Sequence, residues 1–516
     1  MDEQAWWSHA VGYEVYIRSF ADSNGDGVGD LVGLTERLDH LVWLGVDICW
    51  ITPFYRSPQA DFGYDVADYC DVDPAFGTLA DFDRLVERAH QLGLRIVVDL
   101  VPNHSSDQHP WFRESRASRG NARRDWYLWR DPAPDGGPPN NWVSHFGGPA
   151  WTLDETTGQY YCHLFLPEQP DLNWRNPEVR EAIDEVFRFW LERGVDGFRI
   201  DTAHLMVKHA DLPDNPELAP VDFSRSHIEQ WLCLDHKYDS AQPENHEIYR
   251  RWHAITRSFD AMLIGETYVF DAAQWNDLLG PEGGLDLGFW FLSMFMAWDA
   301  DAVARVLNGP QPPGRRRAGW VLSSHDQSRP ATRFGGGDQG RRRALALSTL
   351  WLGLPGVPFL YQGEELGLVD GHVPVEAKAD PVGSPDDPTS GRDGCRTPMP
   401  WQPGVAQGFS TSADCWLPPG HDDTVTVAVQ RDDPDSWLHR YRDLLAVRRS
   451  LPELADADMT VVVDDGVITV QRNTIDFVVN MSEREVRADG EVLYRTDSSS
   501  PHDGALAPDH AAIVRR

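Results

Sequence analysis

Short apolar runs alternate with amphipathic, helix-like stretches along most of this 516-residue chain. Runs rich in β-branched and aromatic residues predict strands, at residues 12–17, 46–51, 94–101, 195–200, 261–266, 285–289, 319–323 and 357–361. Apolar positions spaced three and four residues apart predict helices, at residues 34–44, 78–92 and 177–193. Repeated strand–helix units imply a parallel sheet. This number of units predicts an α/β fold, a closed (β/α)8 TIM barrel.

Two regions interrupt this alternation. Residues 104–173 are rich in Trp, Pro, Gly and Asn and show no clear helix, which predicts an inserted subdomain after the third strand. From residue 455 onward, short β runs alternate with turns, which predicts a small antiparallel C-terminal domain of β-sandwich type. The expected domains are a barrel of residues 1–103 and 174–454, an inserted subdomain B of residues 104–173, and a C-terminal domain of residues 455–516.

Acidic residues outnumber basic ones, 81 to 46, which gives a formal net charge of −35. Such a charge opposes binding to nucleic acid and to anionic membranes, because both require basic patches. No apolar run approaches the length of a membrane span, and the first ten residues, MDEQAWWSHA, do not resemble a signal peptide. Six scattered cysteines without a CxxC pair predict reduced thiols. We therefore expect a cytoplasmic monomer or homodimer with no nucleic-acid or membrane partner.

Charged residues stand at the ends of the predicted strands. The stretch GVDGFRID ends in Arg199 and Asp201, which the two-residue period of a strand directs to the same side. The guanidinium of Arg199 would lower the pKa of Asp201 and keep that carboxyl ionised. Glu266 and Asp326 follow two later strands. Because the carboxyl ends of barrel strands converge on one face, we expect these three acids to meet there.

Three carboxyl groups held close together can act as both acid and base. Like charges push pKa values apart, so one group stays protonated while another is ionised. That division is what retaining glycoside hydrolysis requires. The alternative is structural, since an Asp after a strand is often a helix N-cap and an Arg–Asp pair can simply close a strand. Three such acids with Arg and His neighbours favour the catalytic interpretation.

Four segments resemble, in this order, the signature regions of the α-amylase superfamily of glycoside hydrolases: DLVPNH, GFRIDTAH, GETY and SSHD. Two more segments, QPDLNW and GVPFLYQGEELG, are similar to motifs that flank those regions. QPDLN is most similar to the oligo-1,6-glucosidase and α-glucosidase branch. The resemblance covers residues 5–450.

This resemblance implies a role for each acid. Asp201 would be the nucleophile, Glu266 the general acid/base, and Asp326 the carboxylate that binds sugar hydroxyls and steadies the transition state. Further residues would bind substrate, with Arg199 orienting the nucleophile and Tyr64 stacking on the sugar ring; the set is Asp61, Tyr64, His104, Arg199, Thr202, His325 and Arg392. An Arg392–Asp61 pair would close the pocket at the non-reducing end, which implies exo action on short chains.

Two positions bear on specificity. In this branch a valine after the nucleophile goes with α-1,6 cleavage, and smaller or hydroxylated residues go with α-1,4 cleavage, so Thr202 implies α-1,4 action. One side chain shifts discrimination by only about 1–3 kcal/mol, and an oligo-1,6-glucosidase remains an alternative. Ser324 stands where the family usually has Asn before the His–Asp pair, so the local hydrogen bonding is expected to differ.

The loop DSNGDGVGD suits a hard cation, because alternating oxygen ligands and glycines favour Ca²⁺. It is not an EF-hand, since Gly33 stands where the twelfth-position Glu would be. The loop resembles the calcium loop after the first strand in oligo-1,6-glucosidase-like enzymes. The implied ligands are the side chains of Asp22, Asn24, Asp26 and Asp30 and the carbonyl of Val28. The ion, Ca²⁺ or Mg²⁺ in its place, would be structural and away from the catalytic face; a turn without metal is the alternative.

The resulting hypothesis is a retaining, exo-acting α-glucosidase that hydrolyses terminal α-1,4-linked glucose from maltose-like substrates or small α-glucosides. Transglucosylation to sugar acceptors is expected alongside hydrolysis, without an organic cofactor. Glucosyl transfer or isomerisation on the same scaffold, as in trehalose synthase or sucrose isomerase, stays open as an alternative. A non-catalytic binding relative is disfavoured because the chain keeps all three acids.

Overall fold

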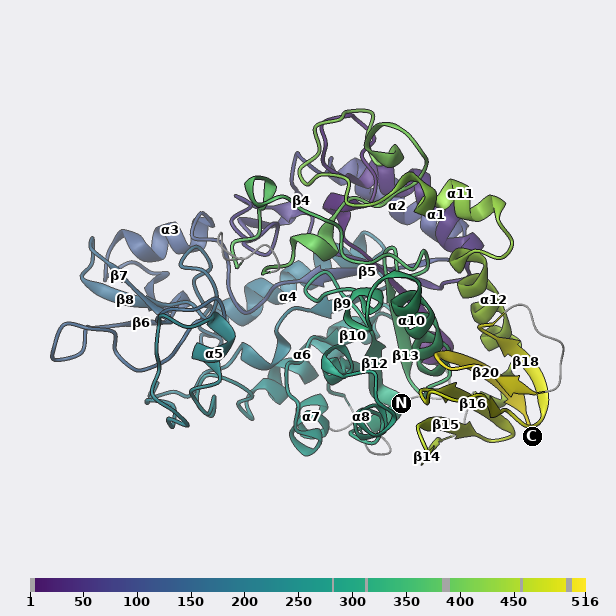
Figure 1. Cartoon of the computed structure of the whole chain (residues 1–516). Helices are drawn as coiled ribbons and strands as arrows, with labels where there is room; N and C mark the ends of the chain where they lie inside the picture. The colour runs from purple at the N-terminus through teal and green to yellow at the C-terminus, as the bar shows by residue number, and fades with distance from the viewer. Residues whose placement is uncertain (1–4, 281–282, 311–313, 383–389, 455–457, 498–503) are drawn as a thin grey trace.

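The computed structural model (Figure 1) describes the chain apart from residues 1–4, 281–282, 311–313, 383–389, 455–457 and 498–503. Parallel strands close into a barrel in the order β1-β13-β12-β11-β10-β9-β5-β2. The strands are β1 Gly12–Val15, β2 Ile48–Ile51, β5 Arg95–Leu100, β9 Gly197–Ile200, β10 Met262–Gly265, β11 Leu287–Phe289, β12 Ala318–Val321 and β13 Val357–Tyr361. The (β/α)8 barrel predicted from the sequence is confirmed, including its short sixth strand.

Helices cover the outside of the barrel, and local sequence sets where they begin. Thr78 caps α2 in a capping box with Asp81, and Asn176 caps α4 ahead of Pro177. The longer helices are α1 Leu31–Leu44, α2 Leu79–Gln91, α4 Pro177–Glu192, α6 Asn245–Arg257, α10 Gly337–Trp351 and α12 Trp437–Arg449. The shorter ones are α5 His227–Trp231, α7 Ala272–Leu279, α8 Ala300–Leu307, α9 Pro330–Arg333 and α11 Val427–Asp432.

Apolar side chains fill the barrel interior, which makes it a packed core. Trp50, Ile264, Phe289 and Phe359 belong to one buried cluster inside the ring of strands. Gly12 carries no side chain where the Phe359 ring approaches, since an added Cβ would lie 2.1 Å from that ring. The barrel is therefore a rigid support for the groups at its rim.

The segment between β5 and α4 forms the left-hand lobe in Figure 1 together with α5. It contains a three-stranded sheet of order β6-β8-β7, made of Trp129–Arg130, Gln159–Cys162 and Trp151–Asp154. It also contains α3, Pro110–Ala117, so the expectation of no helix here is wrong. The helix starts with Pro110 at its first position and the His109 side chain as cap, a start signal that is easily overlooked in a Pro- and Trp-rich stretch. A hairpin of β3 Tyr55–Arg56 and β4 Asp68–Val72 precedes this region.

A five-stranded antiparallel sheet, yellow in Figure 1, follows α12. Its order is β14-β15-β16-β20-β18, formed by Thr460–Asp464, Val467–Arg472, Ile475–Asn480, His510–Arg515 and Glu491–Arg495. One face, with Phe477 and Ile513, joins the main core beside α10. A second pair of strands, β17 Val486–Arg487 and β19 Ala505–Leu506, contributes to a small cluster on the other face.

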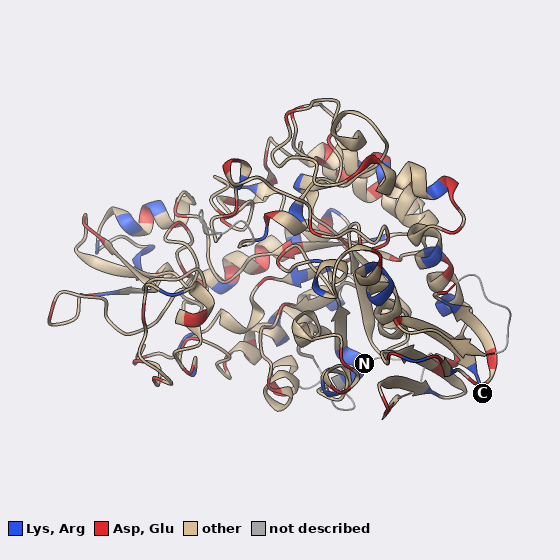
Figure 2. Ribbon diagram, viewed as in Figure 1, with Lys and Arg blue, Asp and Glu red and all other residues tan. Residues whose placement is uncertain are grey.

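Basic and acidic residues are interspersed along the helices and loops in Figure 2. Within the part of the chain that the structure describes, no helix has the length and apolar character needed to cross a bilayer. All six cysteines are free thiols.

Candidate active site

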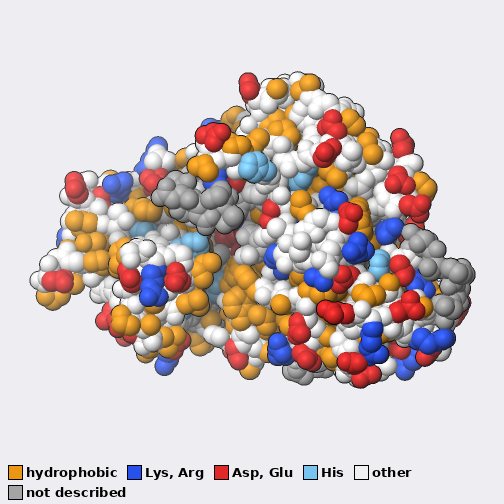
Figure 3. Space-filling model, in the orientation of Figure 1, with side chains coloured by type: hydrophobic (Ala, Val, Ile, Leu, Met, Phe, Trp, Pro, Cys, Tyr) orange, Lys and Arg blue, Asp and Glu red, His pale blue; other side chains and the backbone are white. Residues whose placement is uncertain are grey.

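The three predicted acids lie at the carboxyl ends of barrel strands. Asp201 follows β9, Glu266 follows β10, and Asp326 lies beyond β12. In the parallel pairing of β9 with β10, Ile200 is opposite Gly265, so the next residue of each strand, Asp201 or Glu266, has the other as its neighbour. Figure 3 shows a hollow between the left-hand lobe and the barrel, with histidine and acidic side chains visible along it.

The buried guanidinium of Arg199 joins three carboxyl groups. Its Nη1 lies 2.6 Å from Asp99 Oδ1 and 2.7 Å from Asp201 Oδ1, and its Nη2 lies 2.8 Å from Glu266 Oε2. Arg199 is 1% exposed and also lies over the Trp50 ring, 5.2 Å from its centroid. The multiple negative neighbours hold the pKa of Arg199 above its ordinary value despite burial. This arginine therefore stays charged and fixes the two carboxyl groups predicted to react.

Burial, rather than Arg199, decides the ionisation of these acids. Burial raises the pKa of Asp201 to about 6, although Arg199 acts in the opposite direction. Burial likewise raises the pKa of Glu266 to about 8, with Arg199 opposing and the charges of Asp201 and Asp326 adding to the rise. The expectation of a lowered pKa for Asp201 is thus wrong, because desolvation in this crowded site outweighs one ion pair. At neutral pH, Asp201 is mostly ionised and Glu266 mostly protonated.

Thr202 orients the carboxyl group of Glu266 through its backbone. Its φ of 41° is in the left-handed region, which is unusual for a β-branched residue and costs about 1–3 kcal/mol. In this conformation the Thr202 N–H donates to Glu266 Oε2 at 2.8 Å, the oxygen that Arg199 also contacts. These two donors occupy Oε2, which leaves Oε1 as the oxygen available to carry a proton. The Thr202 hydroxyl donates to Asp201 Oδ2 at 3.3 Å, so one residue contacts both acids.

His325 is held between two tyrosine rings and next to Asp326. Its ring stacks on Tyr16 and Tyr64, each with centroids 5.4 Å away. Nδ1 lies 2.5 Å from Glu14 Oε1, and Nε2 lies 2.9 Å from the Tyr64 hydroxyl and 3.3 Å from Asp326 Oδ2. Burial lowers the pKa of His325 well below its ordinary value, which favours the neutral ring.

Arg392 connects the third acid to Asp61. Its guanidinium lies 3.0 Å from Asp61 Oδ1, 3.1 Å from Asp326 Oδ1 and 2.8 Å from Asp380 Oδ1. Arg396 adds a contact of 2.8 Å to Asp326 Oδ1. Burial alone would raise the pKa of Asp326, but His325, Arg392 and Arg396 together hold that pKa below its ordinary value. Asp326 is therefore ionised at any physiological pH.

His104 and Tyr64 lie in the same cluster. His104 Nε2 is 3.1 Å from the Tyr64 carbonyl oxygen and 3.1 Å from Gln169 Nε2, and burial lowers the pKa of His104 to about 4. The Gln169 amide also donates to Asp61 Oδ2 at 3.2 Å. Tyr64 donates to Asp99 Oδ2 at 3.1 Å, so its hydroxyl is engaged by protein groups. The structure thus brings together all ten predicted catalytic and substrate-binding residues.

Several members of this cluster had no assigned role in the sequence-based prediction. Glu14 had a signal, because it is a charged residue within the apolar run of β1. Arg396 follows Arg392 in one motif, and Gln169 begins the QPDLNW motif. Asp99 ends a predicted strand, but its contact with Arg199 depends on barrel closure. Asp380 comes from a long segment after β13, and no spacing in the sequence indicates it.

Ser324 forms a local turn before the His–Asp pair. Its hydroxyl accepts from the Asp326 N–H at 3.1 Å, and it is bridged to Gln327. The short serine side chain therefore fixes the backbone of Asp326 directly.

The glycine-rich loop of residues 22–30 is organised by its own backbone. Asp22 accepts from the N–H groups of Asn24, Gly25 and Gly27, and Asp26 accepts from that of Val28. Asp30 caps α1 by accepting from Gly33 N–H. Among the described residues, no three or more His, Cys, Asp and Glu side chains gather as a metal-ion cluster. The donor set is nonetheless all oxygen, as a hard cation requires.

This loop follows the carboxyl end of β1, on the side of the barrel that carries the acids, contrary to the expectation from the sequence. The Trp416 N–H donates to the Gly27 carbonyl at 3.0 Å. The Trp416 ring lies 6.0 Å from the Tyr16 ring, which stacks on His325. The loop is therefore connected to the acid cluster through two aromatic side chains.

Comparison with known proteins shows the family to which this chain is similar. Residues 14–457 match the family described as alpha amylase, catalytic domain. A probable alpha-glucosidase of Rhizobium meliloti (strain 1021) is 46% identical over 472 residues, which are 89% of this chain and 85% of that protein. An oligo-1,6-glucosidase of Heyndrickxia coagulans is 37% identical over 504 residues, covering 89% of this chain and 88% of its own.

Solved structures are similar over almost the whole chain. An alpha-glucosyl transfer enzyme, XgtA, superposes with a TM-score of 0.90 and 40% identity, covering 99% of this chain and 100% of that one. The trehalulose synthase MutB from Pseudomonas mesoacidophila MX-45 has a TM-score of 0.88 and 33% identity, covering 99% of each chain. The family match, these relatives and the barrel with acids at its rim lead to one conclusion: the chain belongs to the α-amylase family of glycoside hydrolases.

Proposed function

We propose that the enzyme is a retaining, exo-acting α-glucosidase that releases terminal α-1,4-linked glucose from maltose-like substrates and other small α-glucosides. The observation that carries the proposal is the pair Asp201 and Glu266, both held by Arg199 and separated in pKa, about 6 against about 8. One group is a nucleophile and the other an acid at the same pH, which is the division that retention requires.

In the first step, Asp201 attacks the anomeric carbon and forms a glucosyl ester. The glycosidic C–O bond breaks, and the proton on Glu266 Oε1 moves to the leaving oxygen. In the second step, Glu266, now a carboxylate, takes a proton from water as that water attacks the anomeric carbon. Asp201 leaves, α-glucose is released, and both acids return to their starting state. A sugar hydroxyl in place of water gives transglucosylation.

The ionised Asp326 supports this chemistry by accepting sugar hydroxyls, while Arg392 and Asp61 limit the site at its non-reducing end. The side chains of Asp61, Asp326 and Arg392 form one ion-pair network. The hydroxyl groups of a bound glucose unit would take the place of some of these ion-pair contacts. A site closed at that end accepts a chain terminus and favours exo action.

Thr202 supports α-1,4 rather than α-1,6 preference. Two similar proteins carry the names alpha-glucosidase and oligo-1,6-glucosidase, so the family includes both specificities among the relatives of this chain. Glucosyl transfer or isomerisation is the second candidate, because the similar solved structures include an alpha-glucosyl transfer enzyme and a trehalulose synthase.

We place the enzyme in the cytoplasm, because six free, scattered thiols suit a reducing compartment. A monomer or homodimer remains the expectation.

A substrate panel separates these candidates. We expect glucose release from maltose to exceed that from isomaltose by roughly 10–200-fold in kcat/KM, since one side chain at residue 202 sets the preference. Sucrose and trehalose test the isomerase alternative, with products separated by chromatography. A rearranged disaccharide as the main product from sucrose would replace the hydrolase proposal, and faster cleavage of isomaltose would reverse the linkage assignment.

Replacing Asp201 by Asn removes the nucleophile but keeps its shape. We expect Asp201→Asn to lower kcat by about 10⁴-fold or more. Arg199 keeps its contacts with Asp99 and Glu266, so the variant should fold, as circular dichroism would show. Asp277→Asn is the matched control, because its side chain is 85% exposed. Near-normal turnover by a folded Asp201→Asn enzyme would show that another group attacks the sugar.

The pH profile follows from the same two groups. Activity requires ionised Asp201, so kcat/KM should rise with pH through a pKa of about 6. Activity also requires protonated Glu266, so kcat/KM should fall with pH through a pKa of about 8. With an aryl α-glucoside whose leaving group needs no proton, Glu266→Gln should lose the alkaline fall while the acid limb remains. An alkaline fall that persists in this variant would assign that limb to another residue.

We further propose that the loop of residues 22–30 binds Ca²⁺ through Asp22, Asn24, Asp26, Val28 and Asp30. The ion would neutralise carboxylates that now rely on backbone N–H groups and would fix the loop against Trp416.

Titration calorimetry of the chelator-treated enzyme with Ca²⁺, and separately with Mg²⁺, tests this site, together with the Tm measured in each ion. We expect Ca²⁺ to raise Tm by roughly 2–5 °C in the wild type and not in Asp26→Asn. Asp277→Asn should behave as the wild type. An equal rise of Tm with Ca²⁺ in Asp26→Asn and in the wild type would show that the ion does not bind in this loop.

A further inference from the structure

One buried carboxyl group next to the acid cluster has no part in the proposed reaction. Glu14 lies on β1 and is 1% exposed. Its Oε1 lies 2.5 Å from Nδ1 of His325 and accepts from the His325 backbone N–H at 3.3 Å. Among the residues that the structure describes, no Arg or Lys lies within ion-pair distance of Glu14. Glu14 therefore contacts the acid cluster through His325.

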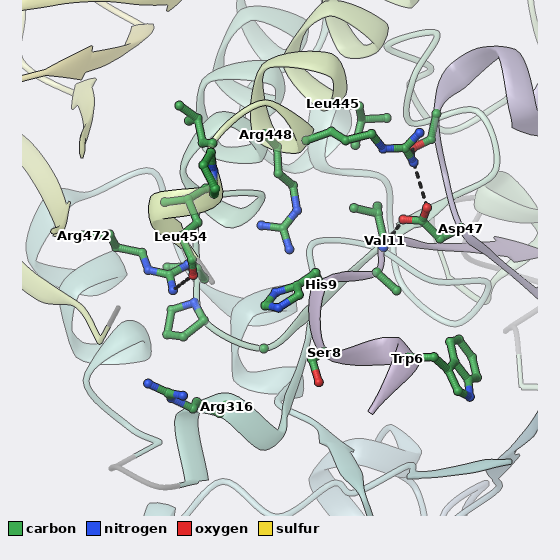
Figure 4. A pocket seen from close by; sticks show the side chains of 18 of the residues that line it. Trp6, Ser8, His9, Val11, Asp47, Arg316, Leu445, Arg448, Leu454 and Arg472 are labelled. Atoms are coloured by element: carbon green, nitrogen blue, oxygen red, sulfur yellow. Dashed lines mark hydrogen bonds and ion pairs between the residues drawn. The ribbon is translucent and has the colours of Figure 1, made fainter. Parts of the chain in front are cut away.

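An acid at the opposite end of the barrel has different surroundings. Asp47 precedes β2, accepts from the Val11 N–H at 2.9 Å and pairs with Arg449 at 2.7 Å (Figure 4). Its side chain is also 37% exposed, so water reaches it. Within the described part of the chain Glu14 has no such cation, and it is almost completely buried. An ionised carboxyl group is costly to bury under these conditions, whereas a protonated one is not.

The hydrogen bonds around Nε2 of His325 decide which ring nitrogen carries the proton. Nε2 lies 2.9 Å from the Tyr64 hydroxyl oxygen and 3.3 Å from Oδ2 of the ionised Asp326. Tyr64 has a single hydroxyl hydrogen, which it donates to Asp99 Oδ2 at 3.1 Å. Both neighbours of Nε2 therefore present lone pairs to it. Only an N–H group at Nε2 makes these two contacts favourable.

With the proton on Nε2, a neutral ring has a lone pair at Nδ1. Burial holds the pKa of His325 well below its ordinary value despite the charge of Asp326, and three arginines lower this pKa further: Arg396, Arg199 and Arg392. Burial, and then the charge of Asp326, raise the pKa of Glu14 well above its ordinary value. At 2.5 Å, either Nδ1 or Glu14 Oε1 must donate a hydrogen to the other. A lone pair at Nδ1 leaves Glu14 as the donor.

We propose that Glu14 is a positioning residue that stays protonated and donates its O–H to Nδ1 of His325. The inference rests on the proposed function, in which His325 and Asp326 bind the sugar. His325 is thereby kept as a neutral ring whose Nε2–H faces Asp326 and a sugar hydroxyl. An ionised Glu14 would instead draw the proton to Nδ1 and turn the lone pair of Nε2 toward the Asp326 carboxylate.

Spectroscopy of the full chain at neutral pH, without substrate, tests the proton positions. The infrared difference between wild type and Glu14→Gln should contain the carbonyl band of one protonated carboxyl group, because other protonated acids cancel. In isotope-labelled enzyme, the NMR signals of the His325 ring nitrogens, assigned by their absence in His325→Gln, should show hydrogen on Nε2 and none on Nδ1. Asp277→Asn is the matched control and should leave both signals unchanged, since its side chain is 85% exposed. A hydrogen on Nδ1 in the wild type would overturn the proposal.

Two substitutions of nearly equal size separate hydrogen-bond donation from packing. The amide of Glu14→Gln can donate to Nδ1 as the protonated acid does, so kcat/KM for maltose should stay within about threefold of the wild type. Glu14→Met leaves Nδ1 buried without a donor, and kcat/KM should fall by about tenfold or more.

Circular dichroism and Tm show whether both variants fold. Equal loss of activity in folded Glu14→Gln and Glu14→Met would overturn the proposal, and so would near-normal activity in both. If Glu14→Met does not fold, the spectra of the wild type and Glu14→Gln still decide between the two proton positions. Failure of the proposed function would appear differently, as a wild type that releases no glucose from maltose, and the spectroscopic test does not depend on it.

Discussion

The charged contacts of Arg199 are the constraint on which the rest of the acid cluster depends. A buried guanidinium is stable only with carboxylates around it, and buried carboxylates gathered at one rim repel one another without it. Arg199 has three such neighbours, on β5, after β9 and after β10. The arginine therefore ties adjacent strands of the barrel together at the position where chemistry is expected. Removing Arg199 would leave these buried carboxyl groups without their shared cation, whereas removing one carboxyl group leaves Arg199 with two others.

Different surroundings give identical chemical groups different roles. Asp326 has His325, Arg392 and Arg396 around it, and these hold its pKa low against the effect of burial. Asp201 and Glu266 share Arg199 with Asp99, so each receives less of its charge, and burial prevails. The Thr202 N–H and Arg199 both contact one oxygen of Glu266, which leaves the other oxygen for the proton. The number of cations per carboxylate thus separates the ionised Asp326 from the two carboxyl groups that we propose as nucleophile and acid/base.

The barrel and most of the acid cluster could be predicted from the sequence, because apolar runs that end in charged residues can be recognised there. The alternation of apolar runs with helical patterns predicts the barrel, and the charged residues at the strand ends predict that Arg199, Asp201 and Glu266 lie in the site. The direction of the Asp201 pKa shift could not be predicted, since burial depends on how neighbouring strands and loops close over the site. Asp380 was missed for the same reason, and α3 was missed because its start signal lies in a stretch whose composition indicates a loop. The position of the loop of residues 22–30 follows from the barrel topology, which a reading of ligand spacing alone does not include.

The left-handed backbone of Thr202 has a consequence for how selectivity can change. The side chain of this residue faces the nucleophile, while its N–H holds the acid. A substitution at residue 202 changes the side chain beside the nucleophile and also the energy that the backbone needs to adopt the left-handed conformation. If Thr202 sets linkage preference and Glu266 is the acid, as proposed, substrate preference and proton delivery would change together at this residue, and substitutions that alter linkage would have to tolerate the left-handed conformation.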